Sequence, residues 1–232
     1  MHKAESTQIP RSITFDFIRH GEPEGGTLYR GSQDDPLSEK GWQQLTSSTE
    51  VALSQGVQWQ EIISSPMKRC ERFAKQLSTQ LSVTLSQDHN LRELAFGDLE
   101  GMTPKQAWQH YPELLTAMWK DPENNTPPNG EAFGDFCDRI EDSLETIINR
   151  QLSQTSIASP HTLLVVHGGV IRAILHRFLN IPASTTFQIE IPFASITRVV
   201  VFSHPEAEGN EKPYTLSLTF VNGIRPACSH NG

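Results

Sequence analysis

Two histidines in this chain each follow an apolar run directly and precede a glycine. They lie in Phe17-Ile-Arg-His-Gly21 and in Val165-Val-His-Gly-Gly169. Imidazole can act as a nucleophile or carry a proton near neutral pH, and a glycine lets a ligand oxygen approach the backbone without meeting a Cβ atom. A third apolar run, Ile62-Ile63, leads to Arg69. Arginines and histidines after three such apolar runs favour a site for a tetrahedral oxyanion, because guanidinium groups match phosphate oxygens.

These residues can act together only if a sheet brings their strands side by side. The run Ile13–Ile18 is rich in β-branched and aromatic residues, and Thr162–Val166 is continuously apolar, as a central parallel strand covered on both faces would be. Open α/β sheets bind their ligands at the carboxyl edge of parallel strands. We therefore expect the four side chains to converge there, with the Gly168 amide at a helix N-terminus that favours anions. The four are Arg19, His20, Arg69 and His167.

The other elements complete a three-layer α/β/α sandwich with a mostly parallel sheet. Ser38 is predicted to cap a helix that runs to about Ser54, and Ser65 to cap a second helix with Pro66 in its first turn. Arg69 lies off the apolar stripe of that second helix. The strongest helical period begins at Glu131. Further predicted elements are a strand near 83–85, a short helix starting at Thr103-Pro104, a helix over 170–178, and strands over 196–202 and 214–221.

We expect one domain over residues 1–232. Residues 1–11 are predicted to be a loose arm, residues 98–130 an insertion that could serve as a lid or be inert, and residues 225–232 a tail. Phe133 and Leu152 mark the ends of the apolar stripe in the long helix after the insertion. The length suffices for a sizeable core in a single α/β domain.

Composition excludes several classes of protein. With 36% hydrophobic and 20% charged residues, the chain is ordinary for a soluble globular protein. Its net charge of −8 and lack of a basic run argue against a nucleic-acid partner. No apolar run approaches the roughly 20 residues that span a bilayer, so no membrane association is expected. The polar N-terminus has no signal-peptide pattern, and we expect a cytoplasmic location.

The residue inventory predicts neither a metal site nor disulfides. The three cysteines, Cys70, Cys137 and Cys228, are widely spaced and form no CxxC pair. Cys70 and Cys137 fall on apolar helical stripes, where small core residues are expected. Arginines beside the histidines would repel a cation. We therefore expect no metal and no cofactor.

Four sequence blocks, taken together, resemble the histidine phosphatase superfamily. They are Phe17–Glu22, Ser64–Arg69, Leu91–Gly101 and Val165–Arg172, and the resemblance extends from about residue 13 to about residue 202. It implies a phosphoglycerate mutase-like fold and catalysis through a phosphohistidine without a metal. It also implies that His20 is the nucleophile, that Glu93 is the proton donor, and that Arg19, Arg69 and His167 hold the phosphoryl oxygens. Without the resemblance, spacing alone would not select Glu93.

Within the superfamily, two segments look like the alpha-ribazole phosphatases of cobalamin biosynthesis. These are the loop Gly25–Ser38 and the stretch from Trp119 to Phe133. The implied substrate is alpha-ribazole 5′-phosphate or the corresponding cobalamin phosphate. In the loop, Arg30 is either an extra substrate contact or a solvated arginine. Glu131 is either a site residue or a carboxylate that the dipole at a helix start favours.

Other functions stay open at this level. The chain could be a broad-specificity phosphatase for sugar or nucleotide phosphates, a phosphoglycerate mutase, or an inactive module that binds phosphorylated partners. Gly26 stands where many superfamily members carry an asparagine that helps to hold phosphate. The expected partner is a small phosphomonoester, and a homodimer is compatible with the sequence, which does not fix the oligomeric state.

Overall fold

The computed structural model describes residues 11–154, 157–204 and 212–224. Over these residues, six strands form one sheet in the order β3-β2-β4-β1-β5-β6. Strands β1, β4, β2 and β3 run parallel, whereas β5 is antiparallel to β1 and β6 is antiparallel to β5. The strands are β1 (Ser12–Arg19), β2 (Glu61–Ser64), β3 (Thr84–Gln87), β4 (His161–Val166), β5 (Ile196–Ser203) and β6 (Tyr214–Ile224).

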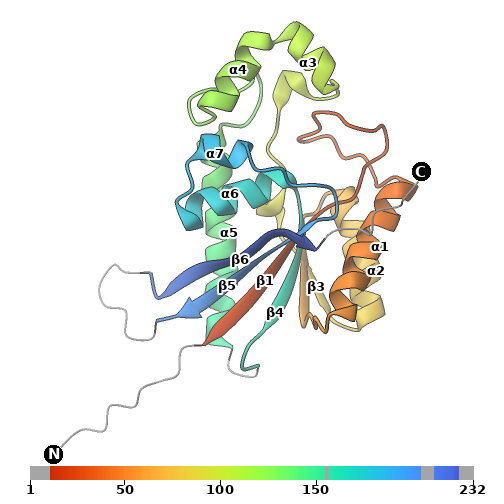
Figure 1. The fold of residues 1–232 in the computed structure, drawn as a ribbon, viewed down its shortest axis with the longest axis vertical. Helices are drawn as coiled ribbons and strands as arrows, with labels where there is room; N and C mark the ends of the chain where they lie inside the picture. The colour runs from red at the N-terminus through yellow and green to blue at the C-terminus, as the bar shows by residue number, and fades with distance from the viewer. Residues whose placement is uncertain (1–10, 155–156, 205–211, 225–232) are drawn as a thin grey trace, which may run out of the picture.

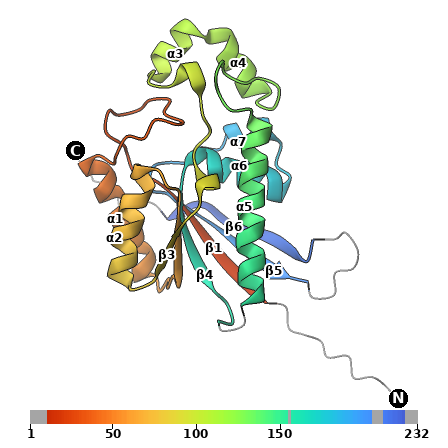
Figure 2. The ribbon, with the colours of Figure 1, turned by 180° about the vertical axis from the view of Figure 1, so that it is seen from behind.

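Helices cover both faces of the sheet (Figures 1 and 2). Phe15 and Phe17 point into a core formed with α5 and α6, whereas Ile18 points into a second core formed with α1 and α2. This alternation along β1 is what a strand buried on both faces requires. The predicted three-layer α/β/α sandwich is confirmed. The helices are α1 (Glu39–Ser54), α2 (Lys68–Leu81), α3 (Pro104–His110), α4 (Pro112–Lys120), α5 (Phe133–Ser153), α6 (Gly168–Leu179) and α7 (Ala183–Phe187), with short 3-10 turns η1 (His89–Leu91) and η2 (Gly97–Leu99).

The predicted insertion folds into two helices at one end of the molecule (Figure 1). Thr103 caps α3 and forms a capping box with Gln106. Helices α3 and α4 enclose a small apolar cluster around Leu99 and Leu115, against which Tyr29 from the loop after β1 also packs. The insertion therefore has a core of its own and is attached to the loops near the end of β1.

Several expected boundaries and roles change. Ser38 caps α1 as predicted, since its hydroxyl accepts a hydrogen bond from the Gly41 amide. The prediction that Ser65 caps the next helix was wrong: α2 begins at Lys68, with Met67 in the cap position and no side-chain cap. The Ser65 hydroxyl instead contacts His167. Helix α7 was not predicted.

The ends of the chain are only partly described. Within the expected arm of residues 1–11, only Arg11 is described, and its guanidinium donates to the carbonyl of Leu152 over 2.7 Å. Residue 11 is therefore fixed to the domain rather than loose. The predicted tail at 225–232, including Cys228, lies outside the described residues. In the described part, no helix combines the length and apolar character that a membrane crossing requires.

Candidate active site

The carboxyl ends of β1, β2 and β4 meet because β4 lies between the other two in the sheet. Arg19 and His20 leave β1, Arg69 lies in the first turn of α2 after β2, and His167 leaves β4. The His20 amide donates to the Val166 carbonyl over 2.9 Å, which fixes the ends of β1 and β4, and with them the two histidines, side by side. The rings of His20 and His167 stack edge to face, with centroids 5.2 Å apart. The structure thus brings together the residues that the sequence predicted to converge.

A pocket of about 180 Å³ opens beside His20. Four guanidinium groups and one carboxylate line it, together with the Gly168 backbone and the aromatic rings of Tyr29, Phe96 and Phe193. Such a concentration of positive charge around one histidine suits a polyanionic ligand. The charged lining residues are Arg19, Arg30, Arg69, Arg172 and Glu93.

His20 is held in one tautomer. Its Nδ1 lies 2.8 Å from the carbonyl oxygen of Gly21, and a carbonyl can only accept, so Nδ1 carries the proton. Burial, followed by the charges of Arg69 and Arg19, holds the pKa of His20 well below its usual value. The neutral ring therefore presents an unprotonated Nε2, the form required for nucleophilic attack.

Gly21 serves a different purpose from the one expected. A Cβ atom at this position would lie 2.1 Å from the carbonyl oxygen of Gly41, in the first turn of α1. Only a residue without a Cβ fits so close to another backbone. Gly21 therefore allows β1 to end against α1, and the expectation that it makes room for a ligand was wrong.

Arg19 and Arg69 each keep a buried donor free. Among the described residues, the Nε atoms of both arginines are buried and have no hydrogen-bond partner. Arg19 is fixed by a 2.5 Å bond from its Nη1 to the Ile191 carbonyl and by stacking on Phe193, with Cζ 4.0 Å from the ring centroid. Burial lowers the pKa of Arg19 to about 10, so the group stays charged at neutral pH. Unpartnered buried donors of this kind are costly unless a ligand oxygen completes them.

Arg69 is more deeply buried than its position off the apolar stripe suggested. It is 1% exposed, and its guanidinium donates to the carbonyls of Gln33 (2.6 Å) and Gly31 (3.1 Å). These carbonyls replace water around the charge, which is how a helix can bury an arginine beside its apolar stripe.

His167, which the resemblance predicted to hold a phosphoryl oxygen, is fully buried and is not among the described residues that line the pocket. Its Nε2 is 2.8 Å from the Ser65 hydroxyl, and the same hydroxyl accepts a 3.4 Å hydrogen bond from the Met67 amide. Burial, then Arg69, His20 and Arg19, hold the pKa of His167 well below its usual value. His167 therefore stays neutral, with its ring packed edge to face against that of His20.

Glu93 lies at the N-terminus of α6. One carboxylate oxygen accepts a 3.2 Å hydrogen bond from the Gly169 amide, and the other a 3.0 Å bond from the Leu94 amide. A Cβ at position 169 would lie 2.1 Å from the Glu93 carboxylate, so Gly169 is needed for this approach. The helix dipole favours a carboxylate in this place.

The loop and helix-start residues take more specific places than the sequence predicted. Arg30 lines the pocket but already donates to Asp35 (3.0 Å) and to the Glu24 carbonyl (2.5 Å). Gly168 lines the pocket as the first residue of α6. Glu131 is not among the described residues that line this pocket, and it pairs with Arg139. In the described part of the chain, no group of three or more His, Cys, Asp or Glu side chains is placed to hold a metal ion.

Arg172 is the functional-site residue that sequence reasoning missed. It lies one turn into α6, and its Nε and one terminal nitrogen donate to the carbonyls of Thr186 and Ile189, both over 3.1 Å. Its other terminal nitrogen lies on the side of Gly168 and Arg19. The spacing of one helical turn from Gly168 was the signal that could have found it.

Comparison with known proteins identifies the family. The model of the histidine phosphatase superfamily (branch 1) matches residues 15–207 of the chain. The chain belongs to the histidine phosphatase superfamily. The match includes the four residues that were predicted to converge, and it confirms the resemblance carried by the four sequence blocks.

The relatives within this superfamily are distant. Glucosyl-3-phosphoglycerate phosphatase of Mycolicibacterium vanbaalenii is 28% identical over 196 residues, which are 83% of this chain and 85% of that protein. Adenosylcobalamin/alpha-ribazole phosphatase of Escherichia coli K12 is 26% identical over 176 residues, which are 75% of this chain and 83% of that protein. A solved structure called mycobacterial hydrolase 2 shares the fold, with a TM-score of 0.81 over 94% of each chain at 24% identity. The protein is a phosphatase of this superfamily, and its substrate is not decided by these similarities.

Proposed function

We propose that the protein hydrolyses a phosphomonoester through a phosphohistidine on His20, with no metal in the chemical step. The observation that carries the proposal is the pairing of a fixed, unprotonated Nε2 on His20 with unpartnered donors on Arg19 and Arg69. Phosphoryl transfer needs mainly positioning and stabilisation of charge on the phosphoryl oxygens, and these groups supply both.

In the first step, Nε2 of His20 attacks phosphorus while the bond from phosphorus to the ester oxygen breaks. The bound phosphate repels a negative charge on Glu93, so this group enters as the carboxylic acid and gives its proton to the departing oxygen, which leaves as an alcohol. Arg19 and Arg69 bind the phosphoryl oxygens, and the ring of the buried neutral His167 packs edge to face against that of His20.

In the second step, the Glu93 carboxylate takes a proton from water, and the water oxygen attacks phosphorus. The bond between phosphorus and Nε2 breaks, its electron pair returns to His20, and inorganic phosphate leaves. One carboxyl group thus acts first as acid and then as base, as microscopic reversibility requires.

For the substrate, we propose alpha-ribazole 5′-phosphate or the corresponding cobalamin phosphate. The proposal rests on the two loop segments that look like alpha-ribazole phosphatases and on the 26% identical relative. The aromatic wall of the pocket is suited to it, since Tyr29 and Phe96 form an edge-to-face pair with centroids 5.3 Å apart. Aromatic rings favour contact with a flat heteroaromatic base.

A second candidate is a phosphorylated glyceric-acid derivative, as in the 28% identical relative. Arg172 favours it, because this guanidinium lines the pocket and could bind a carboxylate on the leaving group. A broad-specificity sugar or nucleotide phosphatase is the remaining alternative.

The test is phosphate release in EDTA from alpha-ribazole 5′-phosphate, glucosyl-3-phosphoglycerate, 3-phosphoglycerate and sugar phosphates. We expect release that prefers the ribazole compound and vanishes in His20→Ala. A preference for glucosyl-3-phosphoglycerate would replace the substrate and keep the mechanism. Release that needs added metal, or that survives in His20→Ala, would contradict the mechanism.

A further inference from the structure

The segment that carries Glu93 has little regular structure of its own. It runs from the turn η1 to the turn η2, and residues 92–96 between the turns belong to no helix or strand. Neither a helix nor a sheet ladder fixes the backbone of the proposed proton donor. Other groups must therefore hold its carbonyls and amides, since buried backbone polar groups are nearly always paired.

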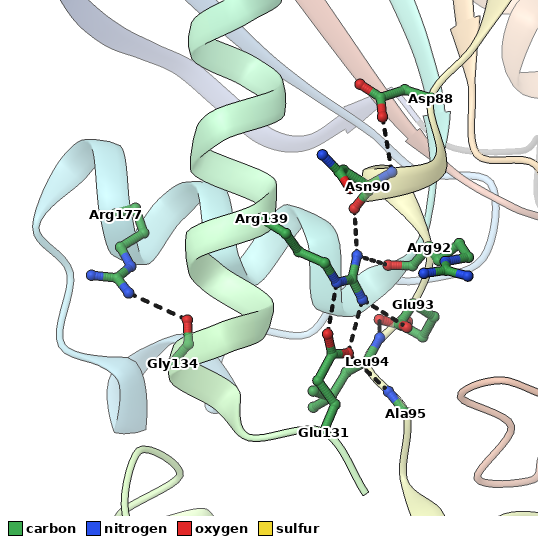
Figure 3. A network of polar contacts seen from close by, with 10 residues as sticks. All are labelled: Asp88, Asn90, Arg92, Glu93, Leu94, Ala95, Glu131, Gly134, Arg139 and Arg177. Atoms are coloured by element: carbon green, nitrogen blue, oxygen red, sulfur yellow. Dashed lines mark hydrogen bonds and ion pairs between the residues drawn. The ribbon is translucent and has the colours of Figure 1, made fainter.

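Arg139, in the second turn of α5, holds the first part of this segment (Figure 3). One terminal nitrogen of its guanidinium donates to the carbonyls of Asn90 and Arg92, the latter over 2.9 Å. The other donates to the carbonyl of Glu93 itself over 3.2 Å. A single side chain thus binds three carbonyls within four residues.

Glu131, just before α5, fixes Arg139 and holds the second part of the segment. Its two oxygens accept from Nε of Arg139 over 2.7 Å and from a terminal nitrogen over 2.8 Å, a bidentate pair. One oxygen also accepts from the Ala95 amide over 3.3 Å, and the Glu131 amide donates to the Ala95 carbonyl over 2.9 Å. The backbone is therefore held on both sides of Glu93. Arg139 binds the carbonyls up to Glu93, and Glu131 binds the amide and carbonyl of Ala95 after it (Figure 3).

The pair does not act on the phosphate pocket directly. Of the described residues, neither Arg139 nor Glu131 lines the pocket beside His20, and both line a neighbouring pocket of about 430 Å³ whose wall includes Glu93. The two side chains are 17% and 22% exposed, so water competes only partly for their hydrogen bonds. Their route to the reaction is through the backbone of Glu93.

We propose that Arg139 and Glu131 are positioning residues that hold Glu93 where it can protonate the leaving group. The inference rests on the proposed role of Glu93. Among the described residues, the Glu93 carboxylate accepts hydrogen bonds from the amides of Leu94 and Gly169 alone, so a shift of its backbone moves the acid off Gly169. Proton transfer needs hydrogen-bond reach, and a displacement of about 1 Å can cost about 100-fold in rate.

Substrates with different leaving groups provide the test. The p-nitrophenolate ion leaves without help from an acid, whereas an alkoxide needs a proton. We expect Glu93→Gln to lower kcat/KM for an alkyl phosphate, which reports only the first step, about 100-fold or more, and kcat/KM for p-nitrophenyl phosphate far less. Arg139→Ala and Glu131→Gln should change the ratio of the kcat/KM values for the two substrates in the same direction as Glu93→Gln, by about tenfold or more. Arg139→Lys should not restore it, since an ammonium cannot make the planar set of bonds.

A matched control lies on the same helix. Arg150 binds both carboxylate oxygens of Glu61, over 2.9 and 2.8 Å, at the far end of α5 from Glu93. Arg150→Ala removes a comparable ion pair and should leave the ratio of the two substrates unchanged. Both substrates are measured on one preparation. A smaller fraction of folded protein therefore lowers both rates equally and leaves their ratio unchanged.

The outcomes separate the two proposals. A ratio that stays at the wild-type value in Arg139→Ala, while Glu93→Gln changes it, would overturn the positioning role and leave the proposed function standing. A wild-type ratio in Glu93→Gln itself would remove Glu93 as the acid and the positioning role with it. An equal change in Arg150→Ala would show that any loss of a pair on α5 has this effect, and would also overturn the inference.

Discussion

The imidazole of His20 donates its Nδ1 proton to the carbonyl oxygen of the next residue, Gly21, over 2.8 Å. This contact between neighbours in the sequence decides which ring nitrogen can react. It leaves Nε2 with its lone pair, and burial together with the charges of Arg69 and Arg19 lowers the pKa of the ring, so that it does not take a second proton near neutral pH. The proposed nucleophile is thus in its reactive tautomer before any substrate binds.

We expect His20 in the ligand-free enzyme to remain neutral well below pH 6.5. Burial and the charges of Arg69 and Arg19 lower its pKa in the folded state, so protonation is postponed to more acid pH. An NMR titration of the imidazole protons, assigned with His20→Gln, measures this directly. A midpoint near pH 6.5 would contradict the electrostatic account of the site.

The same shift should make the fold less stable in acid. The unfolded chain binds a proton at His20 and at His167 near pH 6.5, whereas the folded chain does not, because both pKa values are lowered. The contribution is therefore favourable above about pH 6.5 and is lost progressively below it. Urea unfolding at pH 7 and pH 5.5 measures the difference, and His167→Gln should reduce it.

Phosphate should stabilise the ligand-free protein through Arg69 and Arg19. Each has a buried Nε without a partner in the described structure, and an oxyanion would supply one. At a concentration about 100 times Kd, binding adds about 2.7 kcal/mol to the free energy of unfolding. Arg69→Lys should weaken phosphate binding about tenfold or more, since it removes a charge-assisted hydrogen bond. Thermal unfolding with and without phosphate or vanadate checks this, with the remote Arg150→Lys as control; equal shifts in both variants would argue against the role of Arg69.

Ser65 should set the tautomer of His167. Its hydroxyl accepts from the Met67 amide and lies 2.8 Å from Nε2 of His167, so its own proton is free to go to that nitrogen. His167 then carries its proton on Nδ1. We expect Ser65→Ala to change the nitrogen chemical shifts of His167 and to lower kcat by about tenfold.

Ser64 offers the matched control. It is equally buried, but its hydroxyl donates to the backbone carbonyl of Ser65 and touches neither histidine among the contacts of the described residues. Ser64→Ala should leave the His167 nitrogen shifts as in the wild type. Shifts that are unchanged in Ser65→Ala would show that this hydroxyl does not decide the tautomer.

Asp16 should be the main acid-sensitive group in the body of the sheet. It is fully buried and accepts hydrogen bonds from Arg198 (2.7 and 2.9 Å), His161 (2.8 Å) and Trp59 (2.9 Å). Burial alone would raise its pKa, but the bonds from Arg198 and His161 outweigh burial and lower it. Its stabilising effect is therefore present above about pH 4 and is lost as pH falls below that.

The corresponding variant is Asp16→Asn. We expect it to cost about 3 kcal/mol in the free energy of unfolding at pH 7, since it leaves Arg198 without its counter-charge. Denaturant unfolding measures this, with the exposed Asp142→Asn as control. A loss no larger than that of the control would mean that the buried pair contributes little.

The sequence alone predicted the six strands, most of the helices and the residues at the strand ends that carry functional groups. The β-branched and aromatic residues of Ile13–Ile18 predicted a strand, and the continuous apolar run 162–166 predicted a strand buried on both faces, because residue type and hydrophobicity are local properties of the chain. Glu93 was found only through the family resemblance. The structure places it at the pocket, but its catalytic role stays a prediction.

Only the tertiary structure decided which groups hold these strand-end residues in place. The carbonyls that bury Arg69 lie about 36 residues before it in the chain, and Ser65 meets a histidine 102 residues later. Arg19 is fixed by Ile191 and Phe193, which follow it by more than 170 residues. Contacts of such sequence separation leave no period or spacing in the sequence, because they depend on the order β2-β4-β1-β5 in the sheet. The groups at the strand ends could be predicted from local sequence, whereas the contacts that hold them in place form only once the sheet has formed.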